Sequence, residues 1–480
     1  MKVIVPLREA LSDERLLGGA IPGESWKPWR TLLIAAMGEE LTDEERELFQ
    51  GLTGREREPL ERVEELWGIV GRRGGKTRAA GTLGAYIATC CDFSDVLAPG
   101  ERGVLPVLAA TQSQAGRAFM HIQGVLQHSP ALSELIDGEP TADTIRLTAP
   151  VDIVVRPANF RTIRSITAIA AICDEVAFWM IEGSVNPDAE ILNALRPALA
   201  TTEGPLVVIS SPYAKRGEVY DTHRRHFGPE GDPLVLVAKA PSKVFNSTLK
   251  QRVIDRAYER DALAAAAEYG ADFRNDIAGF VTREVVEACV TPGLFERGHI
   301  SANDYFGFVD PSGGLNDAMT LAIAHSEDGR GVLDVVRERK PPFSPEAVVA
   351  DYCEVLKAYG LTNVTGDRYG GEWPREQFRK HGVEYELAEQ PRSDLYRDLL
   401  PQLNSGQVDL LDLPALVTQF CSLERRVARG GRESIDHPPK GHDDVANAVA
   451  GALSLVRDRE GPSVGMFLTS RVRGVHRTAA

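Results

Sequence analysis

"GRRGGKT", residues 71–77, ends like a phosphate-binding loop but is one residue short of the usual pattern. The pattern G-x-x-x-x-G-K-[ST] would place its first glycine at position 70, which is Val70, whereas the nearest glycine is Gly71. The flanking "LWGIV" (66–70) is typical of a buried strand, and "TRAAGTLGAYIATC" (77–90) predicts a helix. A strand-to-helix turn is the context that such a loop requires. The alternative is a glycine-rich turn with a basic flank.

A phosphate-binding loop at this turn assigns a task to each part of the stretch. Backbone N–H groups of the turn and the start of the following helix would cradle phosphates. Lys76 would reach the β and γ oxygens of a nucleotide, and Thr77 would bind magnesium. The predicted nucleotide-binding residues of the loop are Gly71, Arg73, Gly74, Gly75, Lys76 and Thr77.

Short apolar runs alternate with amphipathic segments on both sides of this loop. Runs of this length, flanked by Gly or Pro, fit buried strands of a mostly parallel sheet with helical crossovers. We therefore predict an α/β domain, a P-loop NTPase fold with a helical lead-in, over residues 1–241. The runs lie at 66–70, 103–111, 151–158, 166–175, 204–212 and 233–241.

A second motif, "AIAAICDEVAF" (168–178), is a strand pattern that ends in Asp174 and Glu175. Beside a phosphate-binding loop, Asp174 would hold Mg²⁺ through water and Glu175 would polarise the attacking water as general base. Taken alone, the acidic pair is explained equally well as the N-terminal cap of a helix. Two such motifs, each on its own strand, together predict hydrolysis of a nucleoside triphosphate.

A third motif, "VVISSPY" (207–213), places Ser211 after another buried strand. In P-loop motors, small hydroxyl residues at this place sense the γ-phosphate, so Ser211 joins the predicted nucleotide-binding residues. The alternative is a strand-ending turn at Pro212.

The architecture changes near the middle of the chain. Residues 242–300 are rich in strong helix formers and predict a helical linker. A strand, "YFGFVD" (305–310), is then followed by two apolar runs around a turn at Asp328 and Gly329. We predict a second domain with a mixed sheet over residues 301–460, and a flexible basic tail over 461–480.

Four aspartates of this second half stand where predicted strands end or where a predicted helix begins. Asp310 ends the first strand, Asp367 ends the later strand pattern "TNVTGD", and Asp443 and Asp444 open the helix "DDVANAVAGALSLV". Singly, each could precede a turn or cap a helix. Two strand-ending aspartates enclose a hairpin, and a late helix begins with two more.

Composition limits the classes of protein that the chain can belong to. With 43% hydrophobic and 26% charged residues it is typical of a globular protein. It contains no apolar run of the ~18 residues that a membrane span needs, and its start does not resemble a signal peptide. The six cysteines form no C-x-x-C pair, so neither a zinc site nor a disulfide framework is predicted. The net charge of −15 argues against extensive DNA-binding surface but permits a local basic groove.

Together the motifs resemble those of the large subunit of the tailed-phage terminase, the DNA-packaging motor. "GRRGGKT" looks like that family's short, arginine-bearing Walker A motif, and residues 161–179 are similar to its Walker B region. The resemblance implies that Arg72 acts as a cis arginine finger, with Arg161 or Arg164 as candidates for a trans finger. The alternative for each arginine is an ordinary sheet-edge or DNA-facing charge.

The same resemblance implies an RNase H-like nuclease in the second half. Such nucleases gather carboxylates around two Mg²⁺ or Mn²⁺ ions, which activate water and stabilise the leaving oxygen. By this resemblance Asp310, Asp367 and Asp444 are catalytic metal ligands, and Asp443 beside them is a further candidate metal-binding residue. Where the family often has one more aspartate, this chain has Asn447.

A further departure lies before the loop, where the family commonly has a glutamine that reads adenine. This chain offers Trp29 and Arg30 in that segment.

The resemblance also implies a function and partners. The chain would use ATP and Mg²⁺ to translocate double-stranded DNA into a procapsid, and would cut concatemeric DNA. It would work with a portal protein and a small terminase subunit, as a homo-oligomer on the portal, in the cytoplasm of a bacterial host. Two alternatives are a helicase-nuclease of repair or recombination and a non-catalytic prophage remnant.

Overall fold

The chain divides into two compact units, whose main segments are Met1–Ala278 and Gly279–Arg425. The second unit also contains the described residues from Glu433 onward. The structure is a computed structural model. It describes residues 1–158, 163, 166–179, 187–315, 317–367, 372–427, 433–439 and 441–460, with side chains as far as 457.

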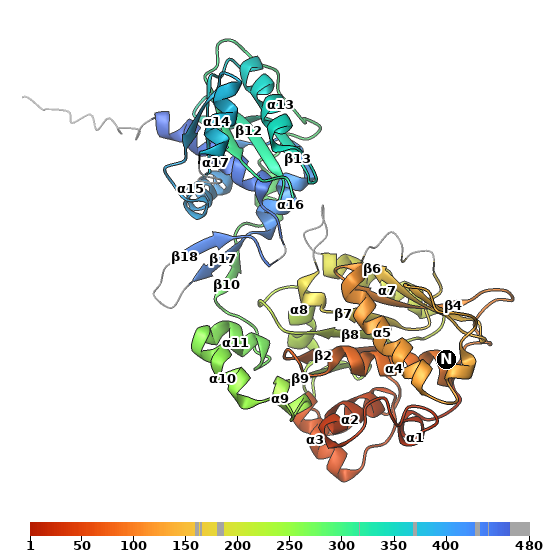
Figure 1. Ribbon diagram of the computed structural model, residues 1–480. Coiled ribbons are helices and arrows are strands. Elements are labelled where there is room, and N and C mark those ends of the chain that lie inside the picture. The colour runs from red at the N-terminus through yellow and green to blue at the C-terminus, as the bar shows by residue number, and fades with distance from the viewer. Residues whose placement is uncertain are drawn as a thin grey trace, which may run out of the picture. The chain divides into compact units, whose positions relative to one another are not determined.

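The first unit is built on a seven-stranded sheet with the order β5-β6-β4-β7-β8-β2-β9 (Figure 1). Neighbouring strands are parallel except for the antiparallel edge pair of β5 and β6. Each of the six apolar runs contains one of these strands, so the predicted α/β architecture is confirmed; the sequence did not indicate β5. The strands are β2 (Glu65–Val70), β4 (Gly103–Ala109), β5 (Thr144–Arg146), β6 (Val151–Pro157), β7 (Ala171–Asp174), β8 (Leu206–Ser210) and β9 (Val235–Ala240).

These strands are apolar on both faces because both faces are covered. In β2, Leu66 and Val70 belong to one hydrophobic core, and Trp67 and Ile69 belong to another. Successive side chains of a strand point to opposite faces, so a strand with a core on each side becomes a continuous apolar run. The first core includes residues of α2, α4 and α5, and the second includes residues of α7.

Helices and short strands complete the first unit. A two-stranded sheet pairs β1 (Lys2–Val3) with β3 (Cys91–Asp92). The helices are α1 (Leu7–Ser12), α2 (Lys27–Ala36), α3 (Asp43–Thr53), α4 (Lys76–Cys90), α5 (Gln112–His128), α7 (Pro187–Ala200), α8 (Glu218–His226), α9 (Ser242–Phe245), α10 (Gln251–Arg260) and α11 (Ala262–Glu268), with single 3₁₀ turns at η1 (Glu24–Trp26), η2 (Ser133–Leu135) and η3 (Val176–Phe178).

The second unit contains a six-stranded mixed sheet with the order β15-β14-β11-β12-β13-β16 (Figure 1). The strands β11, β12 and β13 are antiparallel, and β14, β15 and β16 each run parallel to their neighbour. Asp328 and Gly329 form the expected hairpin turn, with φ of 52° and 75°. The predicted mixed sheet is confirmed. Its strands are β11 (Tyr305–Asp310), β12 (Met319–Glu327), β13 (Arg330–Arg339), β14 (Asn363–Gly366), β15 (Glu384–Leu387) and β16 (Val408–Asp409).

The helix α17 (Asp444–Glu460) lies close against this sheet because small residues face it. A Cβ on Gly451 would come within 2.3 Å of the Phe308 ring on β11, so only glycine permits this approach.

The other helices are α12 (Arg283–Glu287), α13 (Pro345–Ala358), α14 (Trp373–Lys380), α15 (Arg392–Asn404) and α16 (Pro414–Ser422). A three-stranded sheet has the order β10 (Ile277–Gly279), β17 (Glu424–Val427), β18 (Glu433–Asp436).

No helix in the described part of the chain is long and apolar enough to cross a membrane. All six cysteines are buried. The segment 461–480, predicted as a flexible basic tail, lies outside the described residues. The segment 242–300, predicted as a helical linker, contains α9, α10, α11 and α12.

Candidate functional site

The first group of predicted site residues meets at the carboxyl edge of the seven-stranded sheet; we call it the nucleotide site. Its members follow β7, β8 and β2, which are neighbours in the sheet. Because parallel strands end at the same edge, residues far apart in sequence come together there, at a place where α/β proteins bind ligands. The nucleotide site comprises Gly71, Arg72, Arg73, Gly74, Gly75, Lys76, Thr77, Asp174, Glu175 and Ser211.

Lys76 connects the three motifs of this site. Its buried Nζ donates hydrogen bonds to the carbonyl oxygen of Val70 and to Oγ of Ser211, both at 2.9 Å. The same Nζ lies 3.3 Å from Oε1 of Glu175. One ammonium group therefore touches the end of β2, the acidic pair and the serine after β8.

Glu175 is held in an unusual backbone conformation. Its φ of 55° lies in the left-handed region, which costs a non-glycine residue about 1–2 kcal/mol. Its N–H donates to the carbonyl oxygen of Ile209 at 2.7 Å, and its Oε2 accepts from the N–H of Ser211 at 2.9 Å. Such strain is concentrated at functional sites, and here it holds the carboxylate beside Lys76.

Asp174 is a buried carboxylate that is only partly satisfied. Its Oδ2 accepts from Oγ1 of Thr77 at 3.3 Å, whereas its buried Oδ1 has no hydrogen-bond partner among the described residues. Burial, with a contribution from the neighbouring charge of Glu175, raises the pKa of Asp174 to about 7. A free carboxylate oxygen beside a threonine hydroxyl fits Mg²⁺, which prefers oxygen ligands and neutralises such a charge.

Two tryptophans support the phosphate-binding loop. The indole N–H of Trp29 donates to the carbonyl oxygen of Gly74 at 2.6 Å. The Trp29 ring packs against the Phe245 ring, with 4.4 Å between the ring centroids. Gly75 has a φ of 84°, and a Cβ there would lie 2.8 Å from the Trp26 ring. Trp29 stands in the segment where the resemblance implies a residue that reads adenine. Its indole instead supports the loop through the hydrogen bond to the backbone of Gly74.

The arginines near the loop have other partners. Arg30 donates to the carbonyl oxygens of Ile21 and Gly23, at 2.9 and 2.7 Å. Arg72, the predicted cis finger, is exposed and its Nη1 lies 3.1 Å from Oε1 of Glu268 at the end of α11. The two candidates for a trans finger, Arg161 and Arg164, lie outside the described residues.

The predicted carboxylates of the second unit meet in one cavity, which we call the carboxylate site. Its volume is ≈ 600 Å³. Asp310 comes from the end of β11, Asp367 follows β14, and Asp443 and Asp444 lie at the start of α17. The cavity is lined by Asp310, Pro311, Ser312, Asp317, Asp367, Ala388, Glu389, Gln390, Pro391, Arg392, His437, His442, Asp443 and Asp444.

Asp310 and Asp367 stand side by side because β11 and β14 are adjacent and parallel, with Val309 opposite Gly366. The amide of Asn447 bridges them: Nδ2 donates to Oδ2 of Asp310 at 2.9 Å and to Oδ2 of Asp367 at 2.7 Å. Burial, followed by repulsion from Asp367, raises the pKa of Asp310 well above its usual range. Burial also raises the pKa of Asp367.

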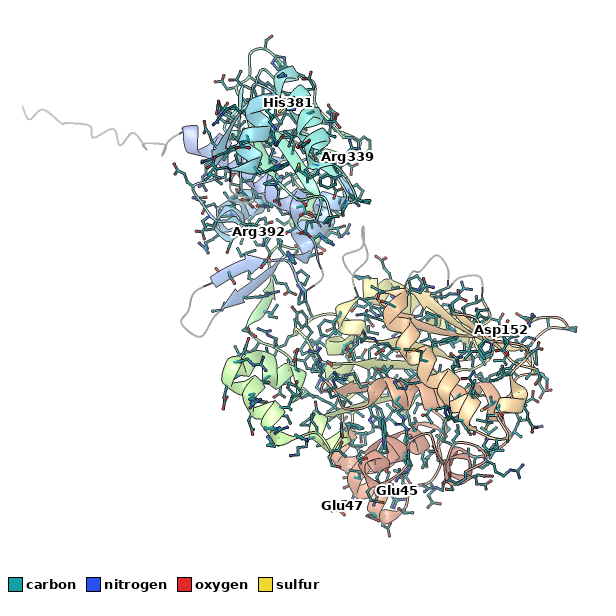
Figure 2. The ribbon with its side chains drawn as sticks, in the orientation of Figure 1. Glu45, Glu47, Asp152, Arg339, His381 and Arg392 are labelled. Carbon is teal, nitrogen blue, oxygen red and sulfur yellow. The ribbon has the colours of Figure 1, made fainter. Side chains whose placement is uncertain are left out.

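Asp443 and Asp444 are adjacent but differ in their surroundings. Asp443 is buried, and its two oxygens accept from Nη1 of Arg392 and from the hydroxyl of Tyr396, each at 2.8 Å. Arg392 is the first residue of α15 and is labelled in Figure 2. Asp444 is partly exposed to the cavity, and burial, with repulsion from Asp443, raises its pKa to about 6. Asp444 is thus the freer of the two carboxylates.

The chemistry of the carboxylate site fits a divalent cation. Within the described residues, no three His, Cys, Asp or Glu side chains already stand in the geometry of a metal site. The amide of Asn447 lies instead between Asp310 and Asp367. The available donors are nevertheless carboxylate oxygens, the ligands that Mg²⁺ and Mn²⁺ prefer, so Asp310, Asp367 and Asp444 could hold such an ion.

Sequence reasoning missed three residues of these sites: Glu268, Arg392 and Tyr396. Arg392 could have been noticed in the sequence, because it stands in the first turn of a helix. A cation there is unfavourable next to the helix dipole, which suggests that an acidic side chain elsewhere pairs with it. Glu268 and Tyr396 left none, since each looks like an ordinary helical residue.

The raised pKa values predict how the metal-free protein responds to pH. In the folded state Asp174 and Asp444 have a pKa of about 7 and about 6, whereas in the unfolded chain each loses its proton near the ordinary aspartate pKa of 3.8. The folded state is therefore favoured at low pH, and this contribution is lost as pH rises through that interval. With a chelator present, we expect a higher melting temperature at about pH 5.5 than at about pH 7.5.

Thermal denaturation followed by circular dichroism checks this expectation. Asp174→Asn and Asp444→Asn should each reduce the difference between the two pH values, because the substituted amide does not titrate. A melting temperature that stays constant or increases toward pH 7.5 would contradict it.

Comparison with known proteins gives matches among solved structures. No protein-family model and no curated protein matches the chain. The large terminase of bacteriophage HK97 is 17% identical with a TM-score of 0.36, covering 82% of this chain and 91% of its own. The large terminase of a thermophilic bacteriophage, in complex with ADP, is 12% identical with a TM-score of 0.36, covering 82% and 94%.

A third match is the large terminase nuclease of thermophilic phage G20c with bound magnesium. It is 17% identical with a TM-score of 0.31, covering 35% of this chain and 94% of its own. All three matched proteins are large terminases, the family that the sequence motifs resemble. Since these TM-scores are below 0.5, the function of this chain has to be inferred from its own side chains.

Proposed function

We propose that the chain is an ATP-driven motor that translocates double-stranded DNA into a procapsid and a metal-dependent endonuclease that cuts it. One observation carries the proposal: a single chain contains both a Lys76–Glu175–Ser211 nucleotide site and a cavity lined by the four predicted aspartates together with Asp317. The residues of the first site are of the kinds that ATP hydrolysis requires, and the aspartates of the second are of the kind that two-metal phosphodiester cleavage requires.

In the nucleotide site, the chain's residues bind ATP and position water. The loop N–H groups and Lys76 would bind the phosphates, and Thr77 with Asp174 would hold Mg²⁺, which spreads the charge of the β and γ oxygens. Glu175 would accept a proton from the attacking water. Since Ser211 contacts both Lys76 and Glu175, it is well placed to report whether the γ-phosphate is present.

In the carboxylate site, Asp310, Asp367 and Asp444 would hold one or two divalent cations, whose chemistry is to activate water and stabilise the leaving oxygen. Arg392 and Tyr396 fix Asp443 through hydrogen bonds. We therefore assign Asp443 to orienting the start of α17 and the metal role chiefly to Asp444.

The proposed partners follow from the packaging role. They are double-stranded DNA, a portal protein and a small terminase subunit, with several copies of this chain on the portal, in the cytoplasm of the bacterial host. The competing proposal is a helicase-nuclease that acts on free DNA, because both activities could use the same two sites.

Two assays separate these proposals. A packaging motor moves along intact duplex, so the purified chain with ATP should displace a third strand from a triplex while leaving a forked duplex paired. Separation of the fork strands would favour a helicase-nuclease. ATP hydrolysis without either activity, even with procapsids added, would remove the translocation proposal.

Arg72→Ala tests the predicted cis arginine finger. Loss of a finger is expected to lower kcat for ATP hydrolysis by about 10³-fold. Its ion pair with Glu268 is exposed on both sides, so the free energy of unfolding should change by less than about 1 kcal/mol. Steady-state ATPase kinetics and urea denaturation measure the two effects. The control is Arg224→Ala, an exposed arginine of α8; an equal kcat in both variants would refute the finger role.

A further inference from the structure

Asn447 lies between two aspartates of the carboxylate site. It is fully buried on the first turn of α17, three residues after Asp444. Its Nδ2 donates to Asp310 and to Asp367, which come from neighbouring strands. Its Oδ1 is buried with no hydrogen-bond partner among the described residues.

The orientation of this amide follows from its partners. Nδ2 lies 2.9 Å from Oδ2 of Asp310 and 2.7 Å from Oδ2 of Asp367, so the reversed amide would place its oxygen, which only accepts hydrogen bonds, against two carboxyl oxygens. The NH₂ group therefore faces Asp310 and Asp367, and each of its two hydrogens has one acceptor. The partly positive hydrogens of one neutral amide thus face both carboxyl groups, where a cation would otherwise have to offset their charge.

We propose that Asn447 is a positioning residue that holds Asp310 and Asp367 together in the metal-free protein and, because its side chain is uncharged, keeps divalent cations loosely bound. The proposal rests on the nuclease function proposed above and deepens it. An aspartate at this position would add a negative charge to the site and remove both hydrogen-bond donors. Cation affinity rises with the number of charged ligands, so the natural asparagine weakens it.

Loose cation binding suits a nuclease that is attached to a motor. The cation would be retained firmly only when a DNA phosphate adds its own oxygen ligands. Cleavage would then depend on how DNA enters the cavity, and DNA that merely passes by during translocation would remain intact.

Titration calorimetry of Mn²⁺ with the full-length chain tests the proposal. Asn447→Asp is expected to bind Mn²⁺ at least about tenfold more tightly than wild type. The matched control, Asn404→Asp, adds the same charge at an exposed position of the second unit and should bind like wild type. Equal affinity of Asn447→Asp and wild type, within about twofold, would overturn the proposal.

Melting temperatures measured in a chelator test the bridging role without any metal. Asn447→Asp and Asn447→Ala should both melt about 2–4 °C below wild type, because both lose the donors to Asp310 and Asp367. Asn447→Ala should gain no Mn²⁺ affinity. Unchanged melting in both variants would overturn the bridging role.

The two readouts also separate this inference from the nuclease itself. If no variant binds Mn²⁺ and wild type cuts no DNA, the proposed nuclease fails, while the melting temperatures still decide whether Asn447 holds the aspartates.

Discussion

Lys76→Ala is expected to lower ATP hydrolysis by at least about 10²-fold while metal-dependent cleavage of plasmid DNA continues. Lys76 is buried, and its Nζ contacts the carbonyl oxygen of Val70 at the end of β2, Ser211 and Glu175. Alanine removes the cation that would meet the γ-phosphate, and it leaves the Glu175 carboxylate without its positive neighbour.

ATPase rates and plasmid nicking with Mn²⁺ or Mg²⁺ should be measured on the same preparations. Lys239→Ala is the matched control, because Lys239 lies in the same sheet, on β9 beside β2, and pairs with Asp272 at 3.5 Å. It should retain ATP hydrolysis. If Lys76→Ala hydrolysed ATP at the wild-type rate, the nucleotide site would be assigned to the wrong residues. If it lost nuclease activity too, the two activities would not be separate.

Asp310→Asn should have the opposite effect, with DNA cleavage reduced by more than about 10²-fold and ATP hydrolysis unchanged. Even residues that only orient metal ligands cost about 10–100-fold when they are replaced, so a direct ligand should cost more. Asparagine keeps the shape of the side chain but removes the charge, and it places a second amide beside that of Asn447.

Conversion of supercoiled plasmid to nicked and linear forms measures this effect. Asp351→Asn is the control, since Asp351 is an exposed residue of α13 in the same unit that pairs with Arg339. Equal cutting by wild type and both variants would identify a contaminating nuclease. An absence of cutting by wild type with either metal would leave an ATPase without nuclease activity.

Much of the fold could be predicted because its signals are local. A strand between two cores becomes an uninterrupted apolar run, and the turn at Asp328 and Gly329 requires residues that accept positive φ. The edge strand β5 was missed because its three residues are too few to form a pattern.

The candidate sites could be predicted only in part. Residues that follow strands were found, since parallel strands end at one edge and bring their last residues together. Arg392 and Tyr396, which hold Asp443, were missed because their places on α15 become meaningful only when α15 and α17 pack together. Glu268 was missed for the same reason, because it reaches Arg72 across 196 positions of sequence.

By itself, the sequence determined most strands of the two large sheets, the strand-to-helix turn around Lys76 and the order of the aspartates, because periodicity and turn chemistry operate over a few neighbouring residues. The tertiary structure alone decided the partners: Lys76 with Ser211, and Asn447 between Asp310 and Asp367. Hydrogen bonds form only within about 3 Å, and only packing determines which distant side chains come that close.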